Sequence, residues 1–365
     1  MKVECQGEKI KEAVLKAERI TGKNLALPIL GSILCIASGK TLKFRATNLS
    51  LGIEIEVPAK IEKEGVVALK GSVLAGFFTT FTKNETVTFS LVGENLTITT
   101  KTNKVILNAQ SHEDFPTIPF VEGEEVTLPL KVFTEGIKSV YFSASVSDIK
   151  PEIASVYIYS EHEQLIFVST DSFRLAEKRS KVRGLSDGIS LLVPYKNIIE
   201  ILRVLPEEGD EIVLKISKNQ IALVSSGIYI TSRVIDGVFP DYKQIIPKEF
   251  TTTITSLKME ILQALKVSNI FSDKFNQISL TAKPKEKYFA LYAKNTDVGE
   301  TTAQVSASLT GESVEMNLNF KYLFDCFQSI PKESVEFLIS GASRPMIIRG
   351  VGDQTFTYLI MPMNK

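Results

Sequence analysis

The sequence holds 365 residues, of which 44% are hydrophobic, and its 42 basic residues are balanced by 42 acidic ones. This length accommodates two or three domains of about 100 to 200 residues. The balanced charge creates no overall field that would attract a nucleic acid or an acidic membrane, so any polyanion must be met by a local patch. No apolar run reaches the roughly 18 residues that a membrane-spanning helix requires.

The cysteines, the histidines and the N-terminus indicate a reducing environment and no metal chemistry. Cys5, Cys35 and Cys326 are odd in number and scattered, which predicts neither a disulfide framework nor a metal site. His112 and His162 lie in polar segments and are interpreted as solvated loop residues. The first residues carry acids and no apolar signal core, so we expect no export. The sequence therefore predicts a cytoplasmic protein without metal or cofactor.

The first third of the chain alternates helical and strand patterns. Residues 9–21 are amphipathic, since Ile10, Ala13, Val14, Ala17 and Ile20 recur at helical spacing. A second helix is predicted over 71–82, with Val73, Leu74, Phe77, Phe78 and Phe81 facing inward. Strands are predicted over 32–36, 41–47, 53–57, 86–91, 96–100 and 104–111, because apolar and polar residues alternate there.

The same pattern then restarts twice. Helices are predicted over 130–143 and 195–205, and again over 257–267, with Leu257, Ile261, Leu262 and Leu265 apolar, and over 321–330. The strands expected around them include 164–170, 228–234, 334–339, 346–349 and 356–361.

Landmarks recur at a nearly constant spacing. Phe115-Pro116 and Phe239-Pro240 lie 124 residues apart, and each is interpreted as an extended connector, because proline disfavours helix there. Ala46-Thr47-Asn48 and Ser169-Thr170-Asp171 lie 123 residues apart. Chance similarity among α+β segments is the alternative, but agreement of several landmarks favours three tandem units. The fold class is therefore α+β, with antiparallel sheets covered by helices on one face.

Three equal units can stack, form a cleft or curve into an arc. In an arc, edge strands of successive units can pair and continue the sheet, which removes exposed edges. The last edge of one chain would then need the first edge of another, and a closed symmetric dimer provides it.

Several longer segments carry a resemblance to a known family. They are Leu27-Pro-Ile-Leu30, Thr170-Asp-Ser-Phe-Arg-Leu175, Asp236-Gly-Val-Phe-Pro-Asp-Tyr242, Asn319-Phe-Lys-Tyr322 and Tyr358-Leu-Ile-Met-Pro-Met363. In this order and spacing they resemble the bacterial sliding clamp family, the β subunit of DNA polymerase III, over essentially the whole chain. The resemblance implies three tandem clamp domains at 1–120, 128–245 and 246–365. It further implies a head-to-tail homodimeric ring, with sheets outside and helices inside.

The implied ring surrounds duplex DNA and tethers the replicative polymerase, with a clamp loader and other DNA-metabolism proteins as further partners. A sliding protein should contact phosphates and not read bases. Cations on polar helix faces are candidates for this contact, and a solvated surface charge is the alternative for each. They are Lys9, Lys16, Arg19, Lys131, Lys138, Lys196, Arg203 and Lys258, to which the resemblance adds Lys23, Asn24 and Lys150.

The resemblance also implies a peptide-binding pocket between the second and third units. A methionine-rich, aliphatic C-terminus would suit varied partners. The alternatives are that Met361-Pro-Met363 only completes the last strand, and that Arg174 only pairs with Asp171. The implied pocket residues are Thr170, Ser172, Phe173, Arg174, Leu175, Pro240, Ile245, Asn319, Tyr322, Ser343, Pro345, Leu359, Ile360, Met361, Pro362 and Met363.

At the dimer seam, the resemblance points to Val105 and Leu107 at one end and to Ile270 and Phe271 at the other. Val105 and Leu107 alternate as an edge strand would. For Phe271, a place in the core is the alternative.

Two competing functions remain at this point. An enzyme with a cleft between units would need a phosphate loop, a metal cluster or a nucleophile motif, and the sequence carries none that we recognise. A three-unit interaction scaffold that never closes is the second alternative.

Overall fold

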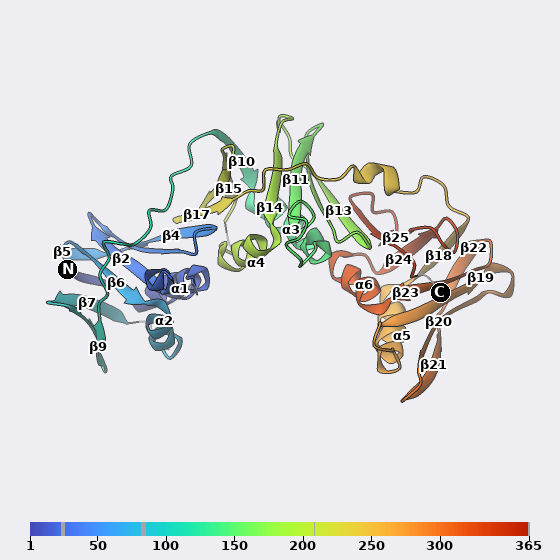
Figure 1. The fold of residues 1–365 in the computed structure, drawn as a ribbon, viewed down its shortest axis with the longest axis horizontal. Helices are drawn as coiled ribbons and strands as arrows, with labels where there is room; N and C mark the ends of the chain where they lie inside the picture. The colour runs from blue at the N-terminus through green and yellow to red at the C-terminus, as the bar shows by residue number, and fades with distance from the viewer. Residues whose placement is uncertain (23–25, 82–84, 208, 364–365) are drawn as a thin grey trace. The chain divides into compact units, whose positions relative to one another are not determined.

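The computed structural model describes residues 1–22, 26–81, 85–207 and 209–363. In that part of the chain the strands form four antiparallel sheets, with five, eight, nine and four strands (Figure 1). The chain divides into two compact units, Met1–Phe133 with Lys196–Val234, and Thr134–Tyr195 with Ile235–Lys365. No described helix is both long and apolar enough to cross a bilayer.

The first third folds as strand, helix and three strands, repeated once, with one additional strand. Helix α1 buries Ile10, Ala13, Val14, Ala17 and Ile20, which confirms the predicted apolar face. The elements are β1 (Lys2–Gln6), α1 (Gly7–Ile20), η1 (Pro28–Gly31), β2 (Ser32–Ser38), β3 (Thr41–Thr47), β4 (Leu51–Pro58), β5 (Lys60–Lys63), β6 (Gly65–Lys70), α2 (Gly71–Thr79), β7 (Thr86–Val92), β8 (Asn95–Thr99) and β9 (Lys104–Asn108).

The central third repeats this order without an additional strand. Its second helix begins at Tyr195, where the sequence predicts it, and its first helix continues into a short 3-10 turn. The elements are β10 (Glu124–Pro129), α3 (Leu130–Val140), η2 (Tyr141–Ser143), β11 (Ser155–Glu161), β12 (Gln164–Thr170), β13 (Arg174–Lys181), β14 (Ser190–Pro194), α4 (Tyr195–Val204), β15 (Glu211–Ile216), β16 (Gln220–Ser225) and β17 (Ile228–Arg233).

The last third repeats it again, with β22 as the additional strand. The elements are η3 (Tyr242–Ile245), β18 (Thr252–Leu257), α5 (Lys258–Ile270), β19 (Gln277–Lys283), η4 (Pro284–Glu286), β20 (Tyr288–Asn295), β21 (Gly299–Gln304), β22 (Ala307–Gly311), β23 (Val314–Asn319), α6 (Phe320–Asp325), η5 (Cys326–Ser329), β24 (Ser334–Ile339), β25 (Met346–Gly350) and β26 (Phe356–Ile360). The predicted triplication of one α+β unit is therefore confirmed.

Two of the sheets continue from one repeat into the next. In the first unit, β17 of the central repeat pairs with β4, which gives the order β10-β15-β16-β17-β4-β3-β2-β6. In the second unit, β13 pairs with the C-terminal strand β26, which gives the order β14-β11-β12-β13-β26-β25-β24-β18-β22. We call these pairings the first joint and the second joint. The other two sheets have the orders β5-β1-β7-β8-β9 and β21-β20-β19-β23.

Three details of the predicted helices are wrong. Helix α2 ends at Thr79, and Val73 is 48% exposed because the buried stripe of this helix runs through Leu74 and Phe78. Leu257 closes strand β18 and is 51% exposed, so it lies outside the apolar face of α5. The predicted helix over 321–330 is a short α-helix, α6, that tightens into the 3-10 turn η5.

Two helical glycines provide a matched test of the packing. A Cβ on Gly136, in α3, would overlap the ring of the fully buried Phe167, whereas a Cβ on Gly76, in α2, would meet no atom within 4 Å. We expect Gly136→Ala to lower the free energy of unfolding by about 1–3 kcal/mol through overpacking. Gly76→Ala should raise it by about 0.5–1 kcal/mol, because alanine favours the helix. Urea denaturation measures both, and equal effects of the two substitutions would contradict this packing.

Candidate functional site

The residues expected to form the pocket gather at the second joint. Strand pairing places Leu175 opposite Leu359 and Arg174 opposite Ile360. Beyond the last paired residues, the N–H of Met361 donates to the carbonyl of Phe173 at 2.8 Å. The hairpin turn before β13 and the C-terminal segment therefore lie side by side.

The turn between β12 and β13 is held by its own polar side chains. Thr170 Oγ1 donates to the carbonyl of Arg174 at 2.6 Å and accepts from the N–H of Ser172 at 3.1 Å. Asp171 Oδ1 accepts from the N–H groups of Phe173 and Arg174, both at 3.0 Å. Ser172 takes a φ of 78°, a left-handed conformation that few side chains adopt. The turn leaves Phe173 61% exposed beside the C-terminal segment.

Arg174 connects this turn to helix α6. Its guanidinium pairs with Asp171 at 3.0 Å and with Asp325 of α6 at 2.7 Å. Its Cζ lies 4.4 Å from the centroid of the Tyr322 ring, a cation–π arrangement. The ion pair offered as an alternative is present, and the same side chain also fixes Tyr322 at the joint. Burial, followed by the charge of Asp171, raises the pKa of Tyr322, so its hydroxyl stays neutral.

The C-terminal segment crosses from the second joint toward β23. Leu359 and Ile360 are buried and complete the core, and strand β26 ends at Ile360, before Met361-Pro-Met363. Met361, Pro362 and Met363 are half-buried, and the N–H of Met363 donates to the carbonyl of Asn317 at 2.8 Å. These three residues thus present apolar side chains outside the core.

Helix α6 begins next to this segment. Asn319 caps it, because its Oδ1 accepts from the N–H groups of Lys321 at 2.9 Å and of Tyr322 at 3.3 Å. The Tyr358 hydroxyl donates to the carbonyl of Tyr322 at 2.7 Å. Strand β26 therefore holds the first turn of α6 in place.

The remaining pocket candidates differ in exposure. Pro240 and Ile245, on the connector before β18, are exposed, whereas Thr170 and Leu175 are buried. Ser343 is exposed and Pro345 is half-buried, directly before β25. Leu175 and Leu359 form part of a core cluster with Phe239 and Tyr242 of the connector, and Met361 packs against it.

The connector between β17 and β18, which contains Phe239 and Tyr242, is held by a buried carboxylate that the sequence did not reveal. Glu177 is 4% exposed, and its carboxylate accepts from Arg179 Nε at 2.7 Å and from the hydroxyl of Tyr242. Tyr242 also shares a hydrogen bond of 2.7 Å with Tyr159. Burial, and then Glu177, raises the pKa of Tyr242, so its hydroxyl remains a donor. The available signal was an acid two residues after Leu175, on the same inward face of a strand.

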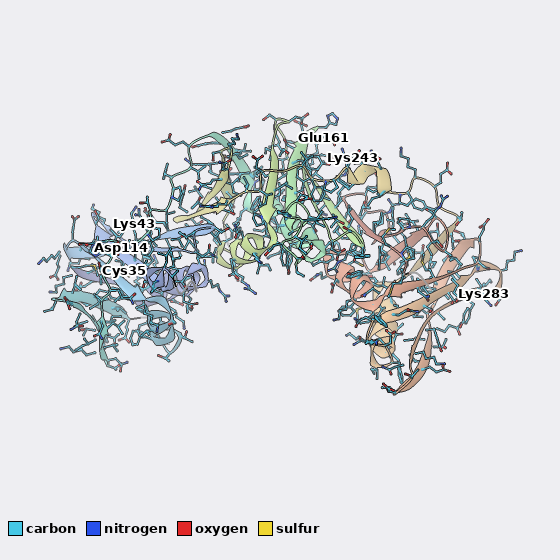
Figure 2. The ribbon with its side chains drawn as sticks, in the orientation of Figure 1. Cys35, Lys43, Asp114, Glu161, Lys243 and Lys283 are labelled. Atoms are coloured by element: carbon cyan, nitrogen blue, oxygen red, sulfur yellow. The ribbon has the colours of Figure 1, made fainter. Side chains whose placement is uncertain are left out.

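A surface ion pair lies over the same connector. Lys243 Nζ lies 2.9 Å from Glu161, and both side chains are labelled in Figure 2. It is solvent-exposed, so we expect it to contribute little to stability.

The predicted DNA-facing cations are mostly exposed. Some already have partners within the chain: Lys16 pairs with Glu12 at 2.6 Å, Arg203 pairs with Glu200 at 2.7 Å, and Lys258 donates to the carbonyl of Ile330 at 2.7 Å. Lys23 and Asn24 lie outside the described residues. The exposed ones are Lys9 and Arg19 on α1, Lys131 and Lys138 on α3, Lys196 and Arg203 on α4, and Lys150 before β11.

The predicted seam residues lie at or beside sheet edges. Val105 and Leu107 are half-buried on β9, which pairs only with β8 in its sheet. Ile270 is 64% exposed at the end of α5, and Phe271 follows it, half-buried. The sequence analysis missed β21, the edge strand of the other small sheet, because its residues, Gly299–Gln304, carry almost no hydrophobic alternation.

Three tandem α+β repeats joined by continuous antiparallel sheet define the architecture of the DNA-clamp class. Family models described as the N-terminal, central and C-terminal domains of the DNA polymerase III beta subunit match residues 1–119, 127–241 and 243–364. The chain belongs to this family.

Curated relatives and solved structures agree with this assignment. The "Beta sliding clamp" proteins of Synechocystis sp. and Bacillus subtilis are each 25% identical to the chain, covering 100% of it and 99% of their own length. The solved DNA polymerase sliding clamp from Bacillus subtilis shares the fold with a TM-score of 0.93 at 23% identity, covering 100% of this chain and 99% of that one. The DNA polymerase III subunit beta from Pseudomonas aeruginosa gives 0.93 at 20% identity, with 100% of both chains covered.

The buried hydroxyl of Tyr242 provides a test of the connector. Tyr242→Phe leaves the Glu177 carboxylate without one donor, so we expect the free energy of unfolding to fall by about 1.5–3 kcal/mol. Tyr157→Phe is the control, because among the described residues its hydroxyl reaches an exposed Ser190 at 3.4 Å, and the change should alter stability by less than about 0.5 kcal/mol. Chemical denaturation measures both variants. An unchanged free energy of unfolding in Tyr242→Phe would argue against this role of the hydroxyl.

Proposed function

We propose that two copies of this chain close head to tail into a ring around duplex DNA, where the ring slides and tethers the replicative DNA polymerase. The observation that carries this proposal is the match of all three repeats to the DNA polymerase III beta subunit family. Its clamp domains span 1–120, 128–245 and 246–365. The protein acts in the cytoplasm, and it confers processivity without catalysing a reaction itself.

Edge strands at the two ends of the repeat series support closure of the ring. β9 and β21 each pair on one side only within their described sheets, so each presents unpaired backbone groups. In a symmetric dimer, β9 of one protomer pairs with β21 of the other, twice. Val105 and Leu107 then meet Ile270 and Phe271, whose apolar side chains lose contact with water.

Binding to DNA needs no base contacts in this account. The exposed cations of α1, α3 and α4 contact phosphates, together with Lys150, and Lys23 and Asn24 join them. Such contacts are independent of sequence and exchange readily with counterions, which permits sliding. Lys16, Arg203 and Lys258 contribute less, because Glu12, Glu200 and the carbonyl of Ile330 already engage them.

The second joint is the docking site for partners. Phe173, Pro240, Ile245, Tyr322 and the segment 361–363 form its surface, and the buried leucines beneath them form its base. Its mixture of aromatic, aliphatic and a few polar groups suits short linear peptides. The replicative polymerase, the clamp loader and other proteins with clamp-binding motifs dock there.

A mutation at the proposed seam separates the ring from a three-domain scaffold that stays open. Leu107→Glu places a charge against apolar side chains, so we expect dimer affinity to fall by about 100-fold or more, since each 1.4 kcal/mol is tenfold. Light scattering after size exclusion should then give the mass of one chain. Val92→Glu changes a residue that is 72% exposed on β7, and it should stay dimeric. A wild-type protein that is monomeric at all concentrations would favour the scaffold.

A second mutation tests the docking site. Phe173→Ala removes an exposed aromatic side chain that a bound peptide would cover, which predicts about tenfold weaker binding of a peptide from the polymerase. Fluorescence anisotropy measures the affinity. Phe120→Ala, at a residue 72% exposed in the first unit, serves as the control. Unchanged affinity in Phe173→Ala with full binding by the wild type would reject this surface.

A further inference from the structure

The backbone pairing at the first joint matches that at the second joint. The N–H of Arg233 donates to the carbonyl of Ser50 at 2.9 Å, as the N–H of Met361 donates to that of Phe173 at 2.8 Å. Strand β17 thus meets β4 in the register in which β26 meets β13. The docking surface proposed for the second joint therefore has a structural counterpart at the first.

The hairpin turns at the two joints also coincide. Thr47 Oγ1 donates to the carbonyl of Leu51 at 2.9 Å and accepts from the N–H of Leu49 at 3.0 Å, which reproduces the bonds of Thr170. Leu49 takes a φ of 74°, against 78° for Ser172. A left-handed leucine is uncommon and strained, so this turn is imposed by its surroundings.

A cavity of about 110 Å³ lies at the first joint. Leu49, which is 42% exposed, lines this cavity, and so does Pro116 of the Phe115-Pro116 connector. Most of its lining residues are the counterparts of residues in the proposed docking surface. This space holds about one side chain of a ligand.

The side chains at corresponding positions of the two joints differ in chemistry. Four apolar residues of the second joint have a polar, charged or missing side chain at the corresponding position of the first joint. Strand register equates Leu175 with Gly52, Leu359 with Thr231, Met361 with Arg233 and Pro345 with Gln220. Among the described residues that line the cavity, Arg233 is the one with a charged side chain.

Thr231 is a buried residue of this cavity. It lines the cavity and is 4% exposed, yet its Oγ1 has no hydrogen-bond partner among the described residues. The hydroxyl oxygen is inaccessible to solvent, so Thr231 reports on the cavity through its methyl signal and does not itself hold the ligand.

We propose that the first joint is a second peptide site, and that it takes an extended segment carrying an aspartate or glutamate. The carboxylate pairs with the guanidinium of Arg233, while a neighbouring aliphatic side chain of the ligand covers Leu49. Charge complementarity with Arg233 selects an acidic peptide over the apolar peptides suited to the second joint. The inference rests on the peptide-docking role proposed for the second joint.

Methyl NMR of the full-length protein tests the proposal, with ¹³C labels on threonine, leucine and methionine methyl groups. The probes are two capped pentapeptides: alanine, leucine, aspartate, leucine, alanine, and the same peptide with asparagine in place of aspartate. We expect the aspartate peptide to shift the signals of Thr231 and Leu49, with an affinity at least tenfold above that of the asparagine peptide. Arg233→Met should remove this difference, whereas Arg183→Met, at another exposed arginine, should preserve it.

Three outcomes would overturn the second site: no shift of the Thr231 and Leu49 signals, equal affinity for the two peptides, or a preference unchanged in Arg233→Met. The signals of Met361 and Met363 report the second joint in the same spectra. If a polymerase peptide fails to move them, the docking role proposed above fails, whatever Thr231 shows.

Discussion

The structure depends on backbone pairing between strands of successive repeats. β4 with β17 and β13 with β26 each form an antiparallel ladder, so the sheets do not stop where one repeat ends. Each ladder pairs two edges that would otherwise expose N–H and C=O groups to solvent or to another chain. The edge strands β9 and β21 expose such groups too, and pairing them requires a second protomer.

Polar side chains then fasten each joint to the helix beneath it. At the first joint, Asn197 of α4 is 5% exposed and donates to the hydroxyl groups of Ser50 at 3.0 Å and Ser232 at 2.8 Å. At the second, Arg174 reaches Asp325 of α6 at 2.7 Å. One backbone arrangement thus carries neutral hydrogen bonds at one position and an ion pair at the other. The repeat conserves the geometry of the joint and leaves its surface chemistry free to differ.

Much of the fold could be predicted from the sequence because similar residues recur at a nearly constant spacing in the three repeats. The recurrence of Thr47-Asn48 as Thr170-Asp171 corresponds to two hairpin turns with the same hydrogen bonds, and the apolar stripe of α1 is buried as its spacing predicts. Spacing could not reveal β21, since none of its residues is buried and its sequence therefore shows little hydrophobic alternation. It also could not show that Val73 faces outward, because α2 is apolar nearly all round.

The candidate site was harder to predict from the sequence than the fold. The resemblance supplied Thr170 to Leu175 and the C-terminal segment, and the structure brings these together at one joint. Glu177 escaped notice because its role requires the connector to return over the sheet and place Tyr242 on its carboxylate, a contact between residues 65 positions apart. The cavity at the first joint arises in the same way, from register between strands distant in sequence.

The central claim is that the protein holds DNA by surrounding it and not by gripping it. The most direct measurement loads the protein onto a nicked circular plasmid with the clamp loader of its own cell, isolates the complex by gel filtration and then cuts the plasmid once. A closed ring should stay on the circle through the column and leave the linear DNA by sliding off its ends. Equal retention on circular and linear DNA would contradict it.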